Sequence, residues 1–347
     1  MNTNPPDETN EPWEPKIESV PSPEVANSLN ANKAYVEAMS ALMLKQVGIC
    51  LNHISKPSDS QFVADLIQQH FAIHFEAYSI LSNSDLPRFL DTDLTVKIEP
   101  EAFTQKLTDL ELPKPNDECL IIRNLDWLTD LFNLTFTERK VLLWSYWTWN
   151  TYGRSLECAL VHIEVDKNYA HESLAVLLDE SFAEIEKCYD TPNKLASLML
   201  SGCNVWHCDL LMLGHYLSGS EFLSDLLEQP HKSKDDLFNC FNKSPLHWHP
   251  PPLPEDVMEL GAWYEPPMAS AMRATALNQP LNARHIASFL ASFTGHSFGL
   301  KQLAPLAGHI DYLTILTAVK QAAIHCCLAR QPLTEFAVLK ALYSAAS

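Results

Sequence analysis

Glycine is scarce in this 347-residue sequence, which contains 9 of them. Only Gly48 and Gly153 precede Gly202. Backbone N–H groups wrap a phosphate most closely where glycine lets the chain turn tightly, so the scarcity excludes most glycine-rich phosphate loops. It also argues against β-architectures that need glycine at many turns.

Basic residues are few as well. Lys and Arg total 24 against 43 Asp and Glu, which gives a formal net charge of −19 at pH 7. Phosphate binding is driven by Lys and Arg that displace counterions. The charge therefore argues against nucleic acid, or an anionic membrane, as the main partner.

The sequence also lacks targeting and membrane signals. Its first residues show no basic region followed by an apolar run, so we expect no secretory signal. The most apolar stretch, 195–217, is interrupted by polar residues, and no membrane span is expected. The 9 cysteines are scattered between Cys50 and Cys327 rather than spaced as a framework. In a chain of this length they indicate reduced, mostly buried thiols and a cytoplasmic protein.

Composition divides the chain into four predicted segments. Residues 1–25 hold six prolines and a net charge of −5, which predicts a disordered acidic arm. Apolar spacings of three and four indicate an acidic helical domain at 26–250. A proline-rich linker is predicted at 251–264, followed by a basic helical domain at 265–347. Residues 268–347 carry a net charge of +4, which leaves −23 on the rest of the chain.

The predicted fold class is all-α, an irregular multi-helix bundle with a winged-helix-like element and a small C-terminal four-helix unit. Asn124 is predicted to cap a helix through Leu131, and the threonines at 135–137 to cap the next, with Glu138 in its first turn. Further helices are predicted at 138–150, 154–163, 170–189, 192–201, 219–228 and 233–242, and a short strand at 94–98.

Four helices are predicted in the C-terminal unit. Asn282 is expected to cap the first, which ends at Phe293, and the second follows Gly295. The third is expected at 310–329, and Thr334 is expected to cap the fourth.

Two segments superficially resemble nucleotide-binding motifs. Residues 295–301 (GHSFGLK) approach a P-loop, but the spacing is wrong, no strand precedes them and no Ser or Thr follows the lysine. Residues 174–180 (LAVLLDE) have the apolar run and acids of a magnesium-binding strand, but their surroundings are helical. We interpret the first as helix termini and the second as the end of one helix. Degenerate nucleotide binding remains an alternative function.

A cluster of Cys and His is the candidate metal site. Cys203, His207, Cys208 and His215 lie within thirteen residues, and zinc favours paired ligands of these types at short spacing. None of these four residues belongs to a C-x-x-C or an H-x-x-x-H pair, so buried thiols and half-buried histidines explain the same residues. A metal-dependent hydrolase using this cluster is the second alternative function.

No motif for covalent catalysis occurs in the structural context that it needs. Residues 295–299 (GHSFG) match the G-x-S-x-G pattern, but no strand precedes them, as a nucleophile elbow requires. The sequence has no HExxH helix, and His325 and Cys326 are adjacent on a helix, so they point about 100° apart. The helices at 170–189 and 192–201, with a wing near 204–206, suggest a winged-helix-like element. Residues 170–215 are acidic, however, so such an element would bind protein rather than DNA. We therefore expect neither an enzyme nor a cofactor.

The densest aromatic patch is Trp144, Tyr146, Trp147 and Trp149. A seam between helices explains these residues. A partner-binding patch is the alternative, because exposed Trp and Tyr make interaction hot spots.

Several segments together resemble a known family. Residues 128–143 (LTDLFNLTFTERKVLL) resemble the LxxLxxLSxxExxLL opening found upstream of the ATPase core in a group of bacterial AAA ATPases. Residues 195–202, 222–227, 235–238 and 250–257 are similar to later steps of that region. Residues 283–342 resemble the small helical lid that ends an AAA module.

The resemblance omits the part that hydrolyses ATP. Only about 25 residues lie between the proline run and the lid-like helices, where that family has a core of well over 100. The resemblance therefore implies a core-less relative, and no catalytic or nucleotide-binding residue can be transferred. We predict a non-catalytic interaction or regulatory protein, an adaptor or assembly factor, with an AAA ATPase as its implied partner.

Overall fold

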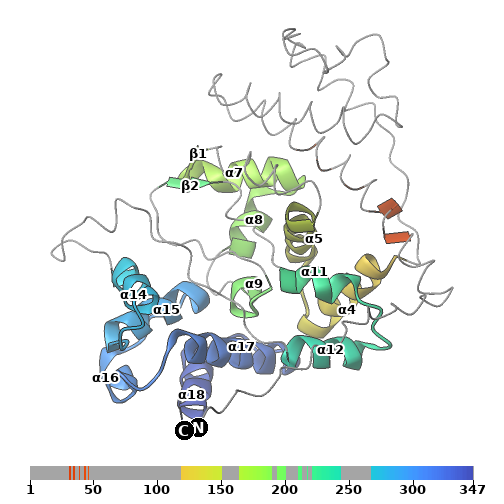
Figure 1. Ribbon diagram of the computed structural model, residues 1–347. Coiled ribbons are helices and arrows are strands. Elements are labelled where there is room, and N and C mark those ends of the chain that lie inside the picture. Colours follow the sequence, from red (N-terminus) through yellow and green to blue (C-terminus); the bar gives the residue numbers. More distant parts are fainter. Residues whose placement is uncertain are drawn as a thin grey trace, which may run out of the picture.

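The computed structural model describes residues 119–150, 164–189, 194–200, 210–212, 217, 221–243 and 267–346, together with isolated positions between 31 and 46. These residues form a multi-helix assembly (Figure 1), which confirms the predicted all-α fold class. The exception is one antiparallel pair of three-residue strands, in which Val165 faces Leu211.

The first group of helices precedes residue 244. The strand β1 (Glu164–Asp166) precedes its third helix, and β2 (Leu210–Met212) follows its fifth. The helices are α4 (Leu120–Phe132), α5 (Phe136–Asn150), α7 (Lys167–Leu178), α8 (Phe182–Tyr189), α9 (Lys194–Ser197), α11 (Glu221–Glu228) and α12 (Lys234–Lys243).

The second group begins at Pro267, with a helix that the sequence did not suggest. Its elements are α14 (Pro267–Ala276), α15 (Ala283–Thr294), α16 (Leu300–Leu303), the 3₁₀ turn η2 (Ala304–Leu306), α17 (Tyr312–Leu328) and α18 (Glu335–Ala345). The four helices predicted here correspond to α15, α16, α17 and α18.

Local capping explains why several helices begin where the sequence predicts. Thr135 and Glu138 form a reciprocal cap at the start of α5: the Glu138 N–H lies 3.2 Å from Thr135 Oγ1, and the Thr135 N–H lies 2.6 Å from Glu138 Oε2. Asn282 accepts hydrogen bonds from the first turn of α15, and Thr334 caps α18. Gly295 ends α15 with a φ of 69°.

The predicted cap at Asn124 is wrong. α4 already begins at Leu120, and Asn124 lies inside it, fully buried. The first turn is capped by a distant residue instead, because Asn32 Oδ1 lies 3.3 Å from the Ile121 nitrogen and 3.3 Å from Cys119 Sγ. A side chain from far away in sequence thus replaces the local cap.

The helix predicted at 170–189 is two helices. α7 ends at Leu178, and Asp179 adopts a left-handed φ of 50° that a continuous helix cannot contain. Lys140 donates to the carbonyls of Leu178 and Asp179, at 3.0 and 3.1 Å. Ser181 Oγ then accepts the Glu184 N–H and starts α8. The helix predicted at 192–201 is likewise shorter, since α9 covers Lys194–Ser197.

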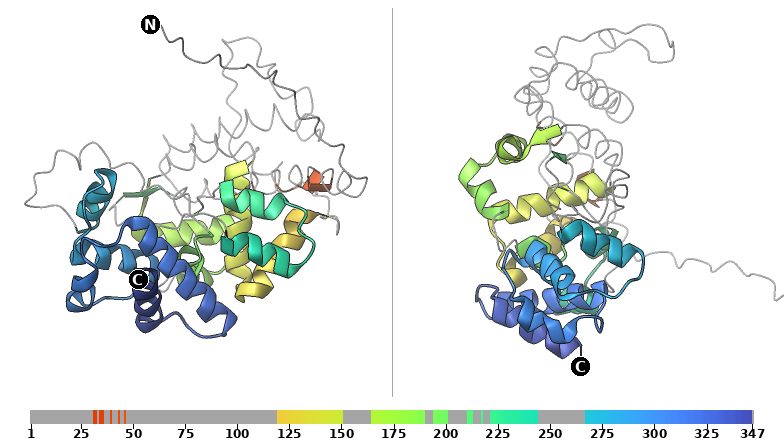
Figure 2. Two further views of the ribbon diagram at one scale, coloured as in Figure 1. Left: turned by 60° about the horizontal axis from the view of Figure 1, so that its bottom comes forward. Right: turned by 90° about the vertical axis from the view of Figure 1, so that its left-hand side faces the viewer.

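Two clusters of buried apolar side chains form the core, and both include α17. The first cluster is centred on α4, α5, α11 and α12 and takes Ala323 and Ile324 from α17. The second is formed by the C-terminal helices and takes Ile315, Leu316 and Val319 from the same helix. Figures 1 and 2 show α17 reaching from α15 and α16 across to α12. The C-terminal helices thus pack directly on the first group.

Several predictions concern residues outside the described part. They are the arm at 1–25, the strand at 94–98, the helix at 154–163, the wing near 204–206 and the linker at 251–264. The domain division therefore stays a prediction.

Candidate functional site

Three lysines donate hydrogen bonds to backbone carbonyls at the C-termini of helices other than their own. Lys140 serves α7 in this way, Lys194 serves α4, and Lys320 serves α12. The last carbonyls of a helix have no partner inside it and carry a partial negative charge, so an ammonium group stabilises them. Two lysines of the first group and one of the second thus stabilise helix ends inside the fold.

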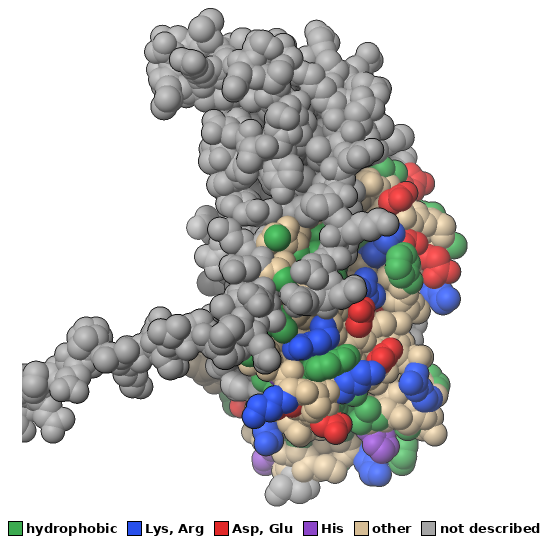
Figure 3. All heavy atoms as spheres, turned by 90° about the vertical axis from the view of Figure 1, so that its right-hand side faces the viewer, with side chains coloured by type: hydrophobic (Ala, Val, Ile, Leu, Met, Phe, Trp, Pro, Cys, Tyr) green, Lys and Arg blue, Asp and Glu red, His purple; other side chains and the backbone are tan. Residues whose placement is uncertain are grey.

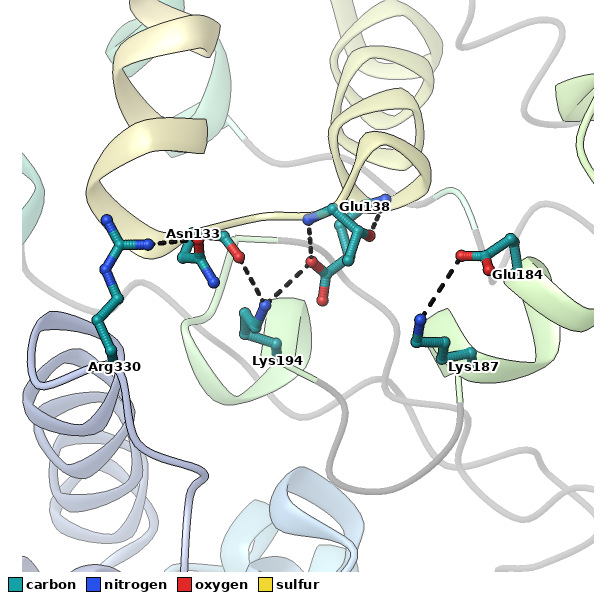
Figure 4. Close-up of polar contacts among 7 residues, drawn as sticks. Asn133, Glu138, Glu184, Lys187, Lys194 and Arg330 are labelled. Atoms are coloured by element: carbon teal, nitrogen blue, oxygen red, sulfur yellow. Dashed lines mark hydrogen bonds and ion pairs between the residues drawn. The ribbon is translucent and has the colours of Figure 1, made fainter.

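The polar contacts around Asn133 form what we call the helix-end junction: Asn133, Glu138, Lys194 and Arg330 (Figure 4). Lys194 Nζ lies 3.0 Å from the Asn133 carbonyl and 3.1 Å from Glu138 Oε2. Arg330, just beyond α17, donates to the side-chain oxygen of Asn133. Asn133 can accept both because it ends α4 with a left-handed φ of 50°. The junction fastens the end of α17 to α4, α5 and α9.

Cys327 on α17 lies within electrostatic range of the junction. Burial raises the pKa of this thiol to about 11, and the positive charge of Lys194 only partly opposes the increase. Burial also raises the pKa of Cys326. Both sulfurs therefore stay protonated at neutral pH, and a thiol is a much weaker nucleophile than a thiolate.

Lys320 is the most unusual charged residue that the structure describes. It is 2% exposed, its Nζ lies 2.8 Å from the Phe241 carbonyl, and it lies 4.3 and 5.2 Å from the ring centres of Phe241 and Phe222. Burial lowers the pKa of this lysine to about 8. We did not identify it from the sequence, although a lysine within an otherwise apolar helical stretch was a usable signal.

The outer side of α18 carries apolar and basic side chains together. Phe336, Lys340 and Tyr343 follow one another at spacings of four and three, so they share one side of the helix. Phe336 is 77% exposed. Tyr343 reaches α16 through a hydrogen bond of 2.5 Å to the Gln302 carbonyl, next to the exposed Leu300 and Lys301. We call Leu300, Lys301, Phe336, Lys340 and Tyr343 the C-terminal face.

The lysines of the C-terminal face differ from those of the first group. Within 119–243, ion pairs join Lys140 to Glu180, Lys194 to Glu138 and Lys234 to Asp130. Among the described residues, no carboxylate lies within ion-pair distance of Lys301 or Lys340. By contrast, basic and acidic side chains lie interspersed on the side of the molecule in Figure 3. The C-terminal face thus combines exposed apolar surface with lysines that pair with no carboxylate in the described part of the chain.

The aromatic patch predicted at 144–149 is part of the core where its side chains are described. Trp144, Tyr146 and Trp147 are 5%, 2% and 3% exposed, and the two indole rings meet edge to face with centres 5.7 Å apart. Tyr146 also donates to Glu228 at 2.8 Å. These three residues form a seam between helices rather than a surface patch. The side chain of Trp149 lies outside the described part.

The two nucleotide-like segments are helix boundaries, as interpreted from the sequence. Gly295 ends α15 and Gly299 begins α16, while Leu174 and Leu178 belong to the last turns of α7.

The candidate metal ligands are not placed. Cys203, His207, Cys208 and His215 all lie outside the described residues. Within the described ranges, no group of three or more His, Cys, Asp or Glu residues is arranged to hold a metal ion.

Comparison with known proteins does not assign the chain to a family. No protein-family model, curated protein or solved structure gives a significant match to this chain. Among the helices that the structure describes, none is both long and apolar enough to cross a membrane.

Proposed function

We propose that this chain is a non-catalytic protein-interaction module, an adaptor or assembly factor, and that the C-terminal face binds its partner. The observation that carries the proposal is Phe336, 77% exposed, beside Lys340, which pairs with no carboxylate among the described residues. An exposed aromatic ring next to a lysine is suited to a protein surface that supplies both apolar side chains and carboxylates. The partner should therefore present an acidic, partly apolar segment.

The sequence suggests which partner to test first. Residues 128–143 and 283–342 resemble parts of bacterial AAA ATPases. We propose an ATPase of that family as the first candidate and regulation of its activity or assembly as the role.

Photo-crosslinking in the cells that make the protein tests the proposal. The photoreactive analogue benzoylphenylalanine replaces Phe336 in one variant and Phe136, which is 64% exposed, in a matched control. We expect crosslinking from position 336 to one protein with an acidic segment, and no such product from position 136. Identical products from both positions, or none from position 336, would contradict the proposal.

A further inference from the structure

The C-terminal face has a chemically matching segment within the same chain. Residues 1–25 contain six acidic residues and a single basic one, Lys16. Between the acids lie Trp13, Ile17 and Val20, so the segment combines carboxylates with apolar side chains. This is the composition that the exposed Phe336 and the unpaired lysines of the face require.

The structure fixes the point from which this segment starts. Asn32 is buried, and its side-chain oxygen accepts from Ile121 at the beginning of α4. The eighteen residues between Trp13 and Asn32 can span roughly 60 Å when extended. A compact chain of this length has a radius of gyration of roughly 20 Å. Residues 1–25 can therefore reach the far side of the molecule.

We propose that residues 1–25 bind the C-terminal face of their own chain when no partner is present, so that a partner must displace them. The acidic residues of the segment would neutralise Lys301 and Lys340, and its apolar side chains would cover Phe336. Tethering gives such a contact an effective concentration in the millimolar range, so a weak interaction suffices. The inference rests on the proposed function, because it names what competes for the same face.

Trypsin provides a test on the full-length purified protein. Lys16 is the first basic residue of the chain and Lys33 is the next, so tryptic cleavage within 1–25 occurs at one bond. Mass spectrometry follows the appearance of the fragment that begins at Ile17. A synthetic peptide of residues 1–25 gives the rate at which trypsin cleaves the same bond when it is unprotected. The peptide keeps the neighbouring glutamates, so the local sequence is the same in both measurements.

The face variant combines Phe336→Glu with Lys340→Glu. Its matched control combines Leu277→Glu with Lys232→Glu, which alters another exposed apolar residue and an exposed lysine, both away from the C-terminal face. Circular dichroism melting shows whether each variant is folded. If the segment is bound about 80% of the time, wild-type cleavage is about fivefold slower than that of the peptide. We expect the control to match wild type and the face variant to approach the peptide.

Two outcomes overturn the inference. The first is cleavage at the peptide rate in wild type, or equal cleavage in wild type and a folded face variant. The second is protection that disappears on tenfold dilution, which indicates that another copy of the chain is bound instead. Neither outcome bears on the photo-crosslinked partner, so failure of this inference is distinguishable from failure of the proposed function.

Discussion

Lys320 places its ammonium group 2.8 Å from the backbone carbonyl of Phe241 and 4.3 Å from the centre of the same residue's ring. The contact joins the middle of α17 to the last turn of α12. Helix C-termini attract positive charge, and an aromatic face attracts a cation, so the carbonyl and the ring of Phe241 both favour the charged lysine. Burial opposes the charge, and it is the stronger influence, because the pKa of Lys320 is lowered to about 8.

Replacing Lys320 is expected to change how stability depends on pH. An unfolded chain holds this proton up to a pH of about 10.4. Because the folded pKa is lower, the Lys320 contribution to the free energy of unfolding rises with pH from about 8 to about 10.4, by about 2 kcal/mol after allowance for solvent screening. Lys320→Met should remove this contribution. Urea unfolding of variant and wild type at several pH values measures the difference.

Comparison with wild type is essential in that experiment. The raised pKa values of Cys240 and Cys327 act in the opposite direction, because the unfolded thiols ionise first. A difference between Lys320→Met and wild type that does not vary between pH 8 and 10 would show that the lysine is not perturbed.

Loss of the Asn124 side chain should be strongly destabilising. Its amide group donates to the carbonyls of Leu227 and Gln229, at 2.9 and 2.8 Å, in a fully buried position. Asn124→Ala leaves the end of α11 without these donors, which costs about 2 kcal/mol. Chemical denaturation provides the measurement, and Asn242→Ala is the control. Asn242 is exposed and makes one side-chain contact, so its replacement should cost less than about 0.5 kcal/mol.

The ion pair of the helix-end junction should be stronger than a surface pair. The Glu138 and Lys194 side chains are 8% and 30% exposed, whereas those of Asp130 and Lys234 are 66% and 45% exposed. Double-mutant cycles with Glu138→Gln and Lys194→Met should give a coupling energy of about 1–2 kcal/mol. The same cycle with Asp130→Asn and Lys234→Met should give about 0.5 kcal/mol or less. Equal coupling energies in the two cycles would show that the ion pair of the junction stabilises the fold no more than a surface pair does.

Two glycines allow the helix-boundary interpretation of 295–301 to be tested. Gly295 has a φ of 69°, and an alanine there is disfavoured by about 1 kcal/mol. Gly299 has a φ of −70°, and an added Cβ would meet the flexible Gln302 side chain, so Gly299→Ala should be nearly neutral. Thermal melting of the two variants distinguishes them. If Gly295 ends a helix, its replacement lowers the melting temperature more than that of Gly299 does. Equal decreases for the two variants would contradict the helix-boundary interpretation.

Sequence reasoning predicted well where one turn of chain determines the structure. Thr135 with Glu138, Asn282 and Thr334 each cap a helix through residues three positions away, so the pattern is visible in the sequence. It failed at Asn124, because the cap of α4 comes from Asn32. It also failed at Asp179, where Lys140 stabilises a break from another helix.

The candidate site was less predictable than the fold for a related reason. Exposure depends on which face of a helix its neighbours leave uncovered, and periodicity alone does not show this. Trp144 and Phe336 are both large aromatic residues in apolar helices, yet one is 5% and the other 77% exposed. The charge difference between the two ends of the chain was visible in the sequence and pointed to the part that carries the C-terminal face.

The sharing of α17 by both apolar clusters has a consequence for protein synthesis. The first cluster needs Ala323 and Ile324, which are translated about 80 residues after α12. At ribosomal speeds of 5–20 residues per second, that cluster remains unfinished for on the order of ten seconds. During this interval the nascent helices expose the apolar surface that α17 will cover.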